Sequence, residues 1–141
     1  MFKLLSKLFR SRLSTISHSS EVQQVGFLMV LMLSVIANRR IRLAESLELN
    51  RIIRKIDWKF NAPKQLESIK AEAMAAVSDP LLLEQFVADA AEKIGNEEVV
   101  EAVAAICSDV TCAGGHTVVD RHHLNFLAEL HQQLRELTRH P

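Results

Sequence analysis

The chain has 141 residues, 48% of them apolar, and its 17 basic side chains balance its 17 acidic ones. This length and composition are those of a single globular domain that is large enough to bury a core. Alanine and leucine dominate the apolar residues and glycine and proline are scarce, which favours helices over sheets. Two cysteines exclude a disulfide framework and favour a reducing compartment.

The charges are distributed unevenly between the two halves. Residues 1–70 carry 13 basic and 5 acidic side chains, a net charge of +8, whereas residues 71–141 carry 4 and 12, a net charge of −8. The halves could attract each other across a shared core. The other interpretation is a basic face for an anionic membrane and an acidic face for another partner.

Residues 1–13 predict a strongly amphipathic helix. On a helical wheel one side carries Met1, Phe2, Leu4, Leu5, Leu8, Phe9 and Leu13, and the other carries Lys3, Lys7 and Arg10. Only Arg12 departs from this pattern. Basic residues interrupt the apolar stretch and no small-residue cleavage site follows, which argues against a secretory signal.

A basic helix with a bulky apolar face is typical of a segment that lies in the plane of a membrane surface. We therefore expect anionic membrane to be bound by Phe2, Lys3, Leu5, Lys7, Leu8, Phe9 and Arg10. The expected location is cytoplasmic, peripheral at an inner membrane. The alternative is a terminal helix that packs on its own domain or on a second subunit. The serines of 11–20 predict a flexible linker, so residues 1–20 form an N-terminal segment and 21–141 the domain.

The domain reads as consecutive helices. They are expected over 20–37, 43–57, 66–77, 80–94 and 97–110 and from about 120 onward. Residues 25–37 contain no charged side chain, but they are fewer than the roughly 20 apolar residues that cross a membrane. We predict that this segment is a buried central helix packed against residues 99–110. The fold class is all-α, with about seven helices.

Two loops have a related layout. Ala37-Asn38-Arg39 and Ala113-Gly114-Gly115 each follow an apolar helix, and a leucine-rich helix follows each. Glu45 and Arg121 lie seven residues after Asn38 and Gly114, respectively. This layout, over residues 21–138, resembles the internal repeat of the tellurite-resistance TerB family and of the related N-terminal domain of DnaJ-like membrane co-chaperones.

The resemblance implies a TerB-like helical bundle with a helix-loop-helix repeat, metal binding through acidic loop residues, and stress-response complexes at the inner face of bacterial membranes. Of the metal ligands it would carry over only Asn38 and Glu45. Asn38 and Gly114 stand where the family has aspartate, and Arg121 where it has glutamate. Because calcium needs several oxygen ligands, we expect no metal or other cofactor in these loops.

The second loop also gathers soft metal ligands. Cys107, Cys112 and His116, with either His122 or His123, could bind zinc. On one helix, however, Cys107 and Cys112 would lie about 140° apart. The alternative is that Cys107 is a small core residue and the histidines are solvated. Cys112 and His116 are a minimal nucleophile–base pair, but no orienting acid accompanies them, so we expect no catalytic residue and no enzyme.

A basic face begins in the first loop and contains Arg39, Arg40, Arg42, Arg51 and Arg54. Acidic residues interrupt it and no aromatic residues are interleaved, which favours a solvated surface over nucleic-acid binding. We therefore expect a non-catalytic TerB-like scaffold or adaptor in a bacterial stress or tellurite-resistance-type pathway, with a protein partner, a membrane surface or a second copy of the chain as candidate partners. The alternative is a soluble metal-binding or metal-sensing protein.

Overall fold

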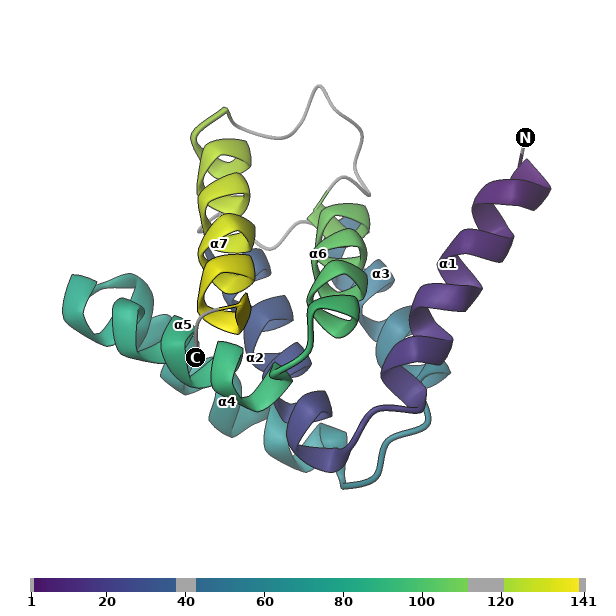
Figure 1. Ribbon diagram of the computed structural model, residues 1–141, viewed down its shortest axis with the longest axis horizontal. Helices are drawn as coiled ribbons and strands as arrows, with labels where there is room; N and C mark the ends of the chain where they lie inside the picture. The colour runs from purple at the N-terminus through teal and green to yellow at the C-terminus, as the bar shows by residue number, and fades with distance from the viewer. Residues whose placement is uncertain (1, 38–42, 112–120, 140–141) are drawn as a thin grey trace.

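The computed structural model describes residues 2–37, 43–111 and 121–139, and within these ranges it forms seven helices and no strand. The helices are α1 (Phe2–Ser17), α2 (Glu21–Ile36), α3 (Leu43–Lys55), α4 (Ala62–Val77), α5 (Pro80–Ile94), α6 (Glu97–Thr111) and α7 (Arg121–Arg139). Figure 1 shows them as a bundle in which α1 lies at one end of the longest dimension and the start of α5 at the other. The predicted all-α class is confirmed.

Local capping chemistry sets the helix ends. The Ser20 side chain accepts from the Gln23 backbone N–H while the Gln23 side chain accepts from the Ser20 N–H, which forms a capping box at the start of α2. Asp79 caps α5 ahead of Pro80, the first helical residue. Gly95 ends α5 with φ +58°, a conformation that other residues adopt at a cost. These boundaries agree with those expected from the sequence.

Helix α2 forms the centre of the core, as predicted. Every residue from Gly26 to Val35 is buried. The helix packs against α4, α5 and α6, and α6 presents buried side chains that include Val100, Val103 and Ile106. An apolar helix that is covered on all sides belongs to a protein core. No described helix has the length and apolar character needed to cross a membrane.

Gly26 allows α2 and α5 to approach closely. A Cβ atom at this position would lie 2.9 Å from Ile94 Cγ1, 3.0 Å from the Ala90 carbonyl oxygen and 3.1 Å from Lys93 Cβ. Two of these neighbours are the backbone and the base of a side chain on α5. The two helices therefore depend on the absence of a side chain here.

The N-terminal helix is longer than the sequence suggested, and the predicted flexible linker over 11–20 is wrong for most of that segment. Helix α1 continues to Ser17, and Leu13 and Ile16 are buried in the core. The hydroxyl of Thr15 donates to the Ser11 carbonyl within the helix. The tertiary contact of two apolar side chains, one turn apart, outweighs the weak helix preference of the serines.

Candidate functional site

The second half of α1 is held firmly against the domain. Leu13 is 6% exposed and Ile16 fully buried, and α1 packs along α6. The buried Gln24 side chain donates to the Ile16 carbonyl at 3.0 Å, and the Ser17 hydroxyl accepts from the Asp57 backbone N–H at 3.1 Å. These contacts join α1 to α2 and to the α3–α4 connection, so this half of the helix is part of the folded body.

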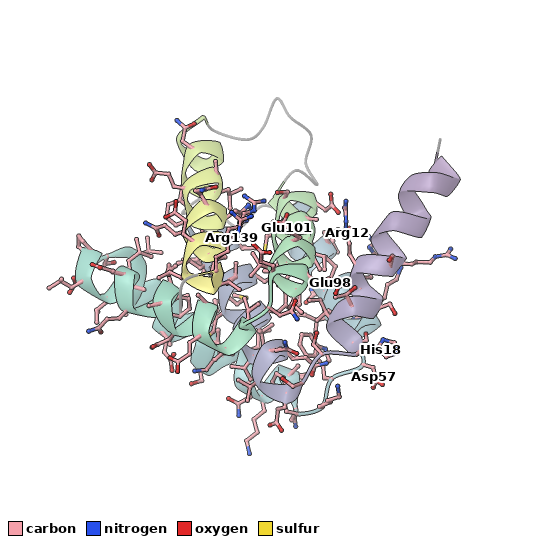
Figure 2. All side chains as sticks on the ribbon, viewed as in Figure 1. Arg12, His18, Asp57, Glu98, Glu101 and Arg139 are labelled. Atoms are coloured by element: carbon pink, nitrogen blue, oxygen red, sulfur yellow. The ribbon has the colours of Figure 1, made fainter. Side chains whose placement is uncertain are left out.

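The contacts of Arg12 explain why this basic residue falls outside the predicted basic face. Its guanidinium forms an ion pair of 3.7 Å with Asp109 of α6, and Figure 2 shows it on the side of α1 that faces α6. Both side chains are more than a third exposed, so the pair contributes little to stability. The ion pair matters because it shows the orientation of Arg12, which is turned toward the domain and not toward the outer surface of α1.

The first half of α1 leads away from the other helices (Figure 1). Arg10 is exposed and forms no ion pair with any described residue. The other residues expected to bind membrane belong to the same helix, and their side chains lie outside the described part: Phe2, Lys3, Leu5, Lys7, Leu8 and Phe9. One helix therefore joins a docked half to a basic half that extends beyond the body.

A groove lies between α5 and α7, and the sequence pattern did not predict it. Its volume is about 830 Å³ and its lining consists of Pro80, Leu83, Glu84, Val87, Ala88, Gln133, Glu136 and Leu137. The α5 residues follow helical spacing along one face. Leu137 of α7, which lines the groove, is 41% exposed. The feature of the sequence that could have indicated this groove is the apolar stripe of α7, which continues to the end of the helix.

The described arginine side chains of α7 are directed to α6 and leave the groove acidic. Arg135 pairs with Glu101 at 2.5 Å, and Arg139 pairs with Glu97. Figure 2 shows Arg139 and Glu101 in the region between α7 and α6. At the groove, Glu84 forms no ion pair with any described residue. The rim facing solvent is therefore negative.

The cysteine and histidine window is only partly described. Cys107 is fully buried, and burial raises the pKa of its thiol to about 12, although a hydrogen bond with Ser34 opposes that shift. Zinc binds the thiolate, so this environment suits a core residue and disfavours a ligand. Cys112 and His116 lie outside the described residues, as does the side chain of His122. Among described residues, no three His, Cys, Asp or Glu side chains gather around a possible metal position.

The first loop and the basic face are also described in part. Asn38, Arg39, Arg40 and Arg42 lie outside the described residues, and so does the side chain of Glu45, which belongs to α3. Arg51 forms an ion pair with Glu48, one turn earlier on α3, and Arg54 is exposed. The described part of this face is thus a solvated helix surface with an internal ion pair.

His131 is a buried polar residue that the sequence did not single out. It is 7% exposed, and its Nε2 atom has no hydrogen-bond partner among the described residues. Burial lowers the pKa of the imidazole, and nearby Arg135 lowers it further while Glu101 opposes the shift. The folded protein therefore favours the neutral side chain.

We predict that this histidine makes the protein less stable in acid. Above its ordinary pKa of 6.5 the imidazole is neutral whether folded or unfolded, and as pH falls below that value the unfolded chain takes up the proton first. The free energy of unfolding should fall accordingly. In a His131→Leu variant the drop in melting temperature between about pH 7.5 and about pH 5.5 should be smaller than in the wild type. An unchanged drop would show that His131 titrates normally in the fold.

Comparisons with known proteins identify no relative. No protein-family model, curated protein or solved structure matches the chain. Inferences about function therefore depend on the sequence itself and on the two surfaces described above, namely the basic half of α1 and the acidic groove between α5 and α7.

Proposed function

We propose that the protein is a non-catalytic helical adaptor that α1 holds at an anionic membrane surface. The observation that carries this proposal is the division of α1. Leu13 and Ile16 dock one half on the body, and the half that ends at the exposed Arg10 leads away from it. A rigid connection of this kind would fix the orientation of the domain at the surface to which the helix binds.

The energetics support reversible binding. Each basic residue near an anionic leaflet contributes about 1 kcal/mol, so Lys3, Lys7 and Arg10 together contribute roughly 3 kcal/mol. Arg12 adds nothing to this sum because it faces Asp109. Burial of the apolar side of the helix in the interface would add to the electrostatic contribution. Because α1 is already helical, less ordering entropy opposes binding than for a flexible segment.

The proposed pathway rests on the sequence resemblance to the TerB repeat. Two helix-loop-helix units, α2–α3 and α6–α7, flank the two loops whose residues resemble the TerB repeat, and their first helices pack against each other in the core. We propose on this basis a TerB-like role in a bacterial stress or tellurite-resistance-type pathway at the inner membrane. The buried thiol of Cys107 argues against a metal-sensing role for the cysteine and histidine window.

We predict salt-sensitive binding to anionic vesicles that requires the first half of α1. In co-sedimentation with phosphatidylglycerol vesicles, the full chain should pellet at low salt and much less at high salt. Reversing Lys3, Lys7 and Arg10 to glutamate should abolish pelleting. The matched control reverses Lys55, Lys64 and Lys70 of α3 and α4, which changes the net charge equally and should leave binding almost intact.

Point variants are preferable to truncation before Ser19, because that truncation would remove Leu13 and Ile16 from the core. If the two triple variants lose vesicle binding equally, the loss results from the change in net charge and not from the position of the reversed residues. If the wild type does not pellet at low salt, the membrane role of α1 is wrong.

A further inference from the structure

The groove between α5 and α7 is lined along α5 by residues of one helical face. Pro80, Leu83, Glu84, Val87 and Ala88 follow the spacing i, i+3, i+4, i+7 and i+8 along α5. Gln133, Glu136 and Leu137 continue the surface on α7. An apolar strip between two helices is where the ridge of a third helix packs. Within the described part of the chain, no helix fills this strip.

The charge of the groove selects the kind of helix. Glu84 and Glu136 are exposed at its edges, and Gln132 donates to Glu136 at 3.2 Å without neutralising it. The arginines of α7 that could neutralise the rim are paired with α6. An occupant should therefore have an apolar face with basic residues beside it, because opposite charges at the edge of an interface steer and stabilise the complex.

The chain itself contains such a helix. Residues 1–13 combine an apolar side with Lys3, Lys7 and Arg10, and no acidic residue precedes Glu21. This helix cannot reach the groove of its own chain, because α1 and the start of α5 lie at opposite ends of the molecule (Figure 1). Two copies lying side by side in opposite directions would place each α1 next to the groove of the other copy.

We propose that the first half of α1 docks in the α5–α7 groove of a second copy, forming a reciprocal pair. This inference rests on the proposed function only in taking the first half of α1 as a binding element. A pair of this kind is isologous, because each copy contributes the same two surfaces. It would cover the helix that binds membrane, so membrane and second copy would compete for α1.

Sedimentation velocity of the full chain without lipid tests the pairing. The wild type should show a concentration-dependent dimer that weakens at high salt. Glu84→Lys combined with Glu136→Lys should raise the dissociation constant at least about tenfold, as should Lys3→Glu combined with Lys7→Glu. Asp89→Lys, a single reversal with half the change in net charge, is the control on α5, since Asp89 is exposed and lies on the side of the helix opposite the groove residues. It should leave the dissociation constant within about twofold.

Combining the four reversals in one chain restores opposite charges across the interface and should recover dimerisation at least in part. Circular dichroism checks that each variant is folded. A wild type that stays monomeric up to about 1 mM would overturn the proposal, as would a groove variant that dimerises like Asp89→Lys. So would a fourfold variant whose loss of dimerisation equals the sum of the losses caused by the helix reversals and the groove reversals separately.

Vesicle binding of the same proteins separates this inference from the proposed function. The groove variant should bind anionic vesicles at least as well as the wild type, and wild-type dimers should dissociate on the vesicles. If the protein forms dimers that respond to the charge reversals as predicted but binds no vesicle, the pairing is correct and the membrane role is wrong. Vesicle binding by a protein that never dimerises would leave the membrane role correct and the pairing wrong.

Discussion

Replacing Gln24 by leucine is expected to lower the free energy of unfolding by about 3 kcal/mol. The Gln24 amide is fully buried and forms three hydrogen bonds: it donates to the Ile16 and Asp57 carbonyls, each at 3.0 Å, and accepts from the Lys59 backbone N–H at 2.9 Å. Leucine has a similar size but satisfies none of these groups. Each would lose its partner in a partly or wholly buried position, at a cost of about 1 kcal/mol or more.

Urea denaturation monitored by circular dichroism measures this loss. The control is Gln85→Leu, which places the same substitution at an exposed position of α5 and should change stability by no more than about 0.5 kcal/mol. Because Gln24 joins α1 to the α3–α4 connection, its loss should also loosen the last turns of α1. Equal stabilities of the two variants would mean that the Gln24 amide is dispensable.

Introducing leucine at Gly26 is expected to destabilise the protein by about 3 kcal/mol or to prevent folding. A Cβ atom there would lie 2.9 Å from Ile94 Cγ1 and 3.0 Å from the Ala90 carbonyl oxygen. The longer leucine side chain would therefore force α2 and α5 apart. Gly26→Ala should cost less, since the gain of about 1 kcal/mol in helix propensity partly offsets the smaller clash.

Thermal melts of Gly26→Ala and Gly26→Leu, each with and without Ile94→Ala, separate crowding from other causes. Shortening Ile94 removes the nearest side-chain atom, so the double variant Gly26→Ala/Ile94→Ala should be more stable than the sum of the single effects predicts. Strict additivity would show that α2 and α5 do not make their closest approach at this glycine.

Much of the helical framework could be predicted because its signals are local. Ser20, Asp79 and Gly95 act as caps within a few residues of the chain, and the charge-free run of α2 can be stable in water only if it is buried. The end of α1 was predicted wrongly because its serines indicate a linker. The decisive contacts of Leu13 and Ile16 are with residues far along the chain.

The binding surfaces were predictable to different degrees. The basic amphipathic pattern of residues 1–13 is a property of one helix, so the sequence displays it directly. The groove depends on how α5 and α7 meet and on the pairing of Arg135 with Glu101, and neither has a local signature. Arg12 shows the same limit: its deviation from the helical pattern was visible in the sequence, but its reason is Asp109, 97 residues later.

Hydrogen exchange along α1 tests most directly the proposed division of this helix into a docked and a free half. In dilute full-length protein, amides of residues 13–17 should be strongly protected and those of residues 5–10 weakly protected. Addition of phosphatidylglycerol vesicles should slow exchange in residues 5–10, and neutral phosphatidylcholine vesicles should not. Equal protection of both halves in the dilute protein without vesicles, or no response to the anionic vesicles, would contradict this division and the membrane role that depends on it.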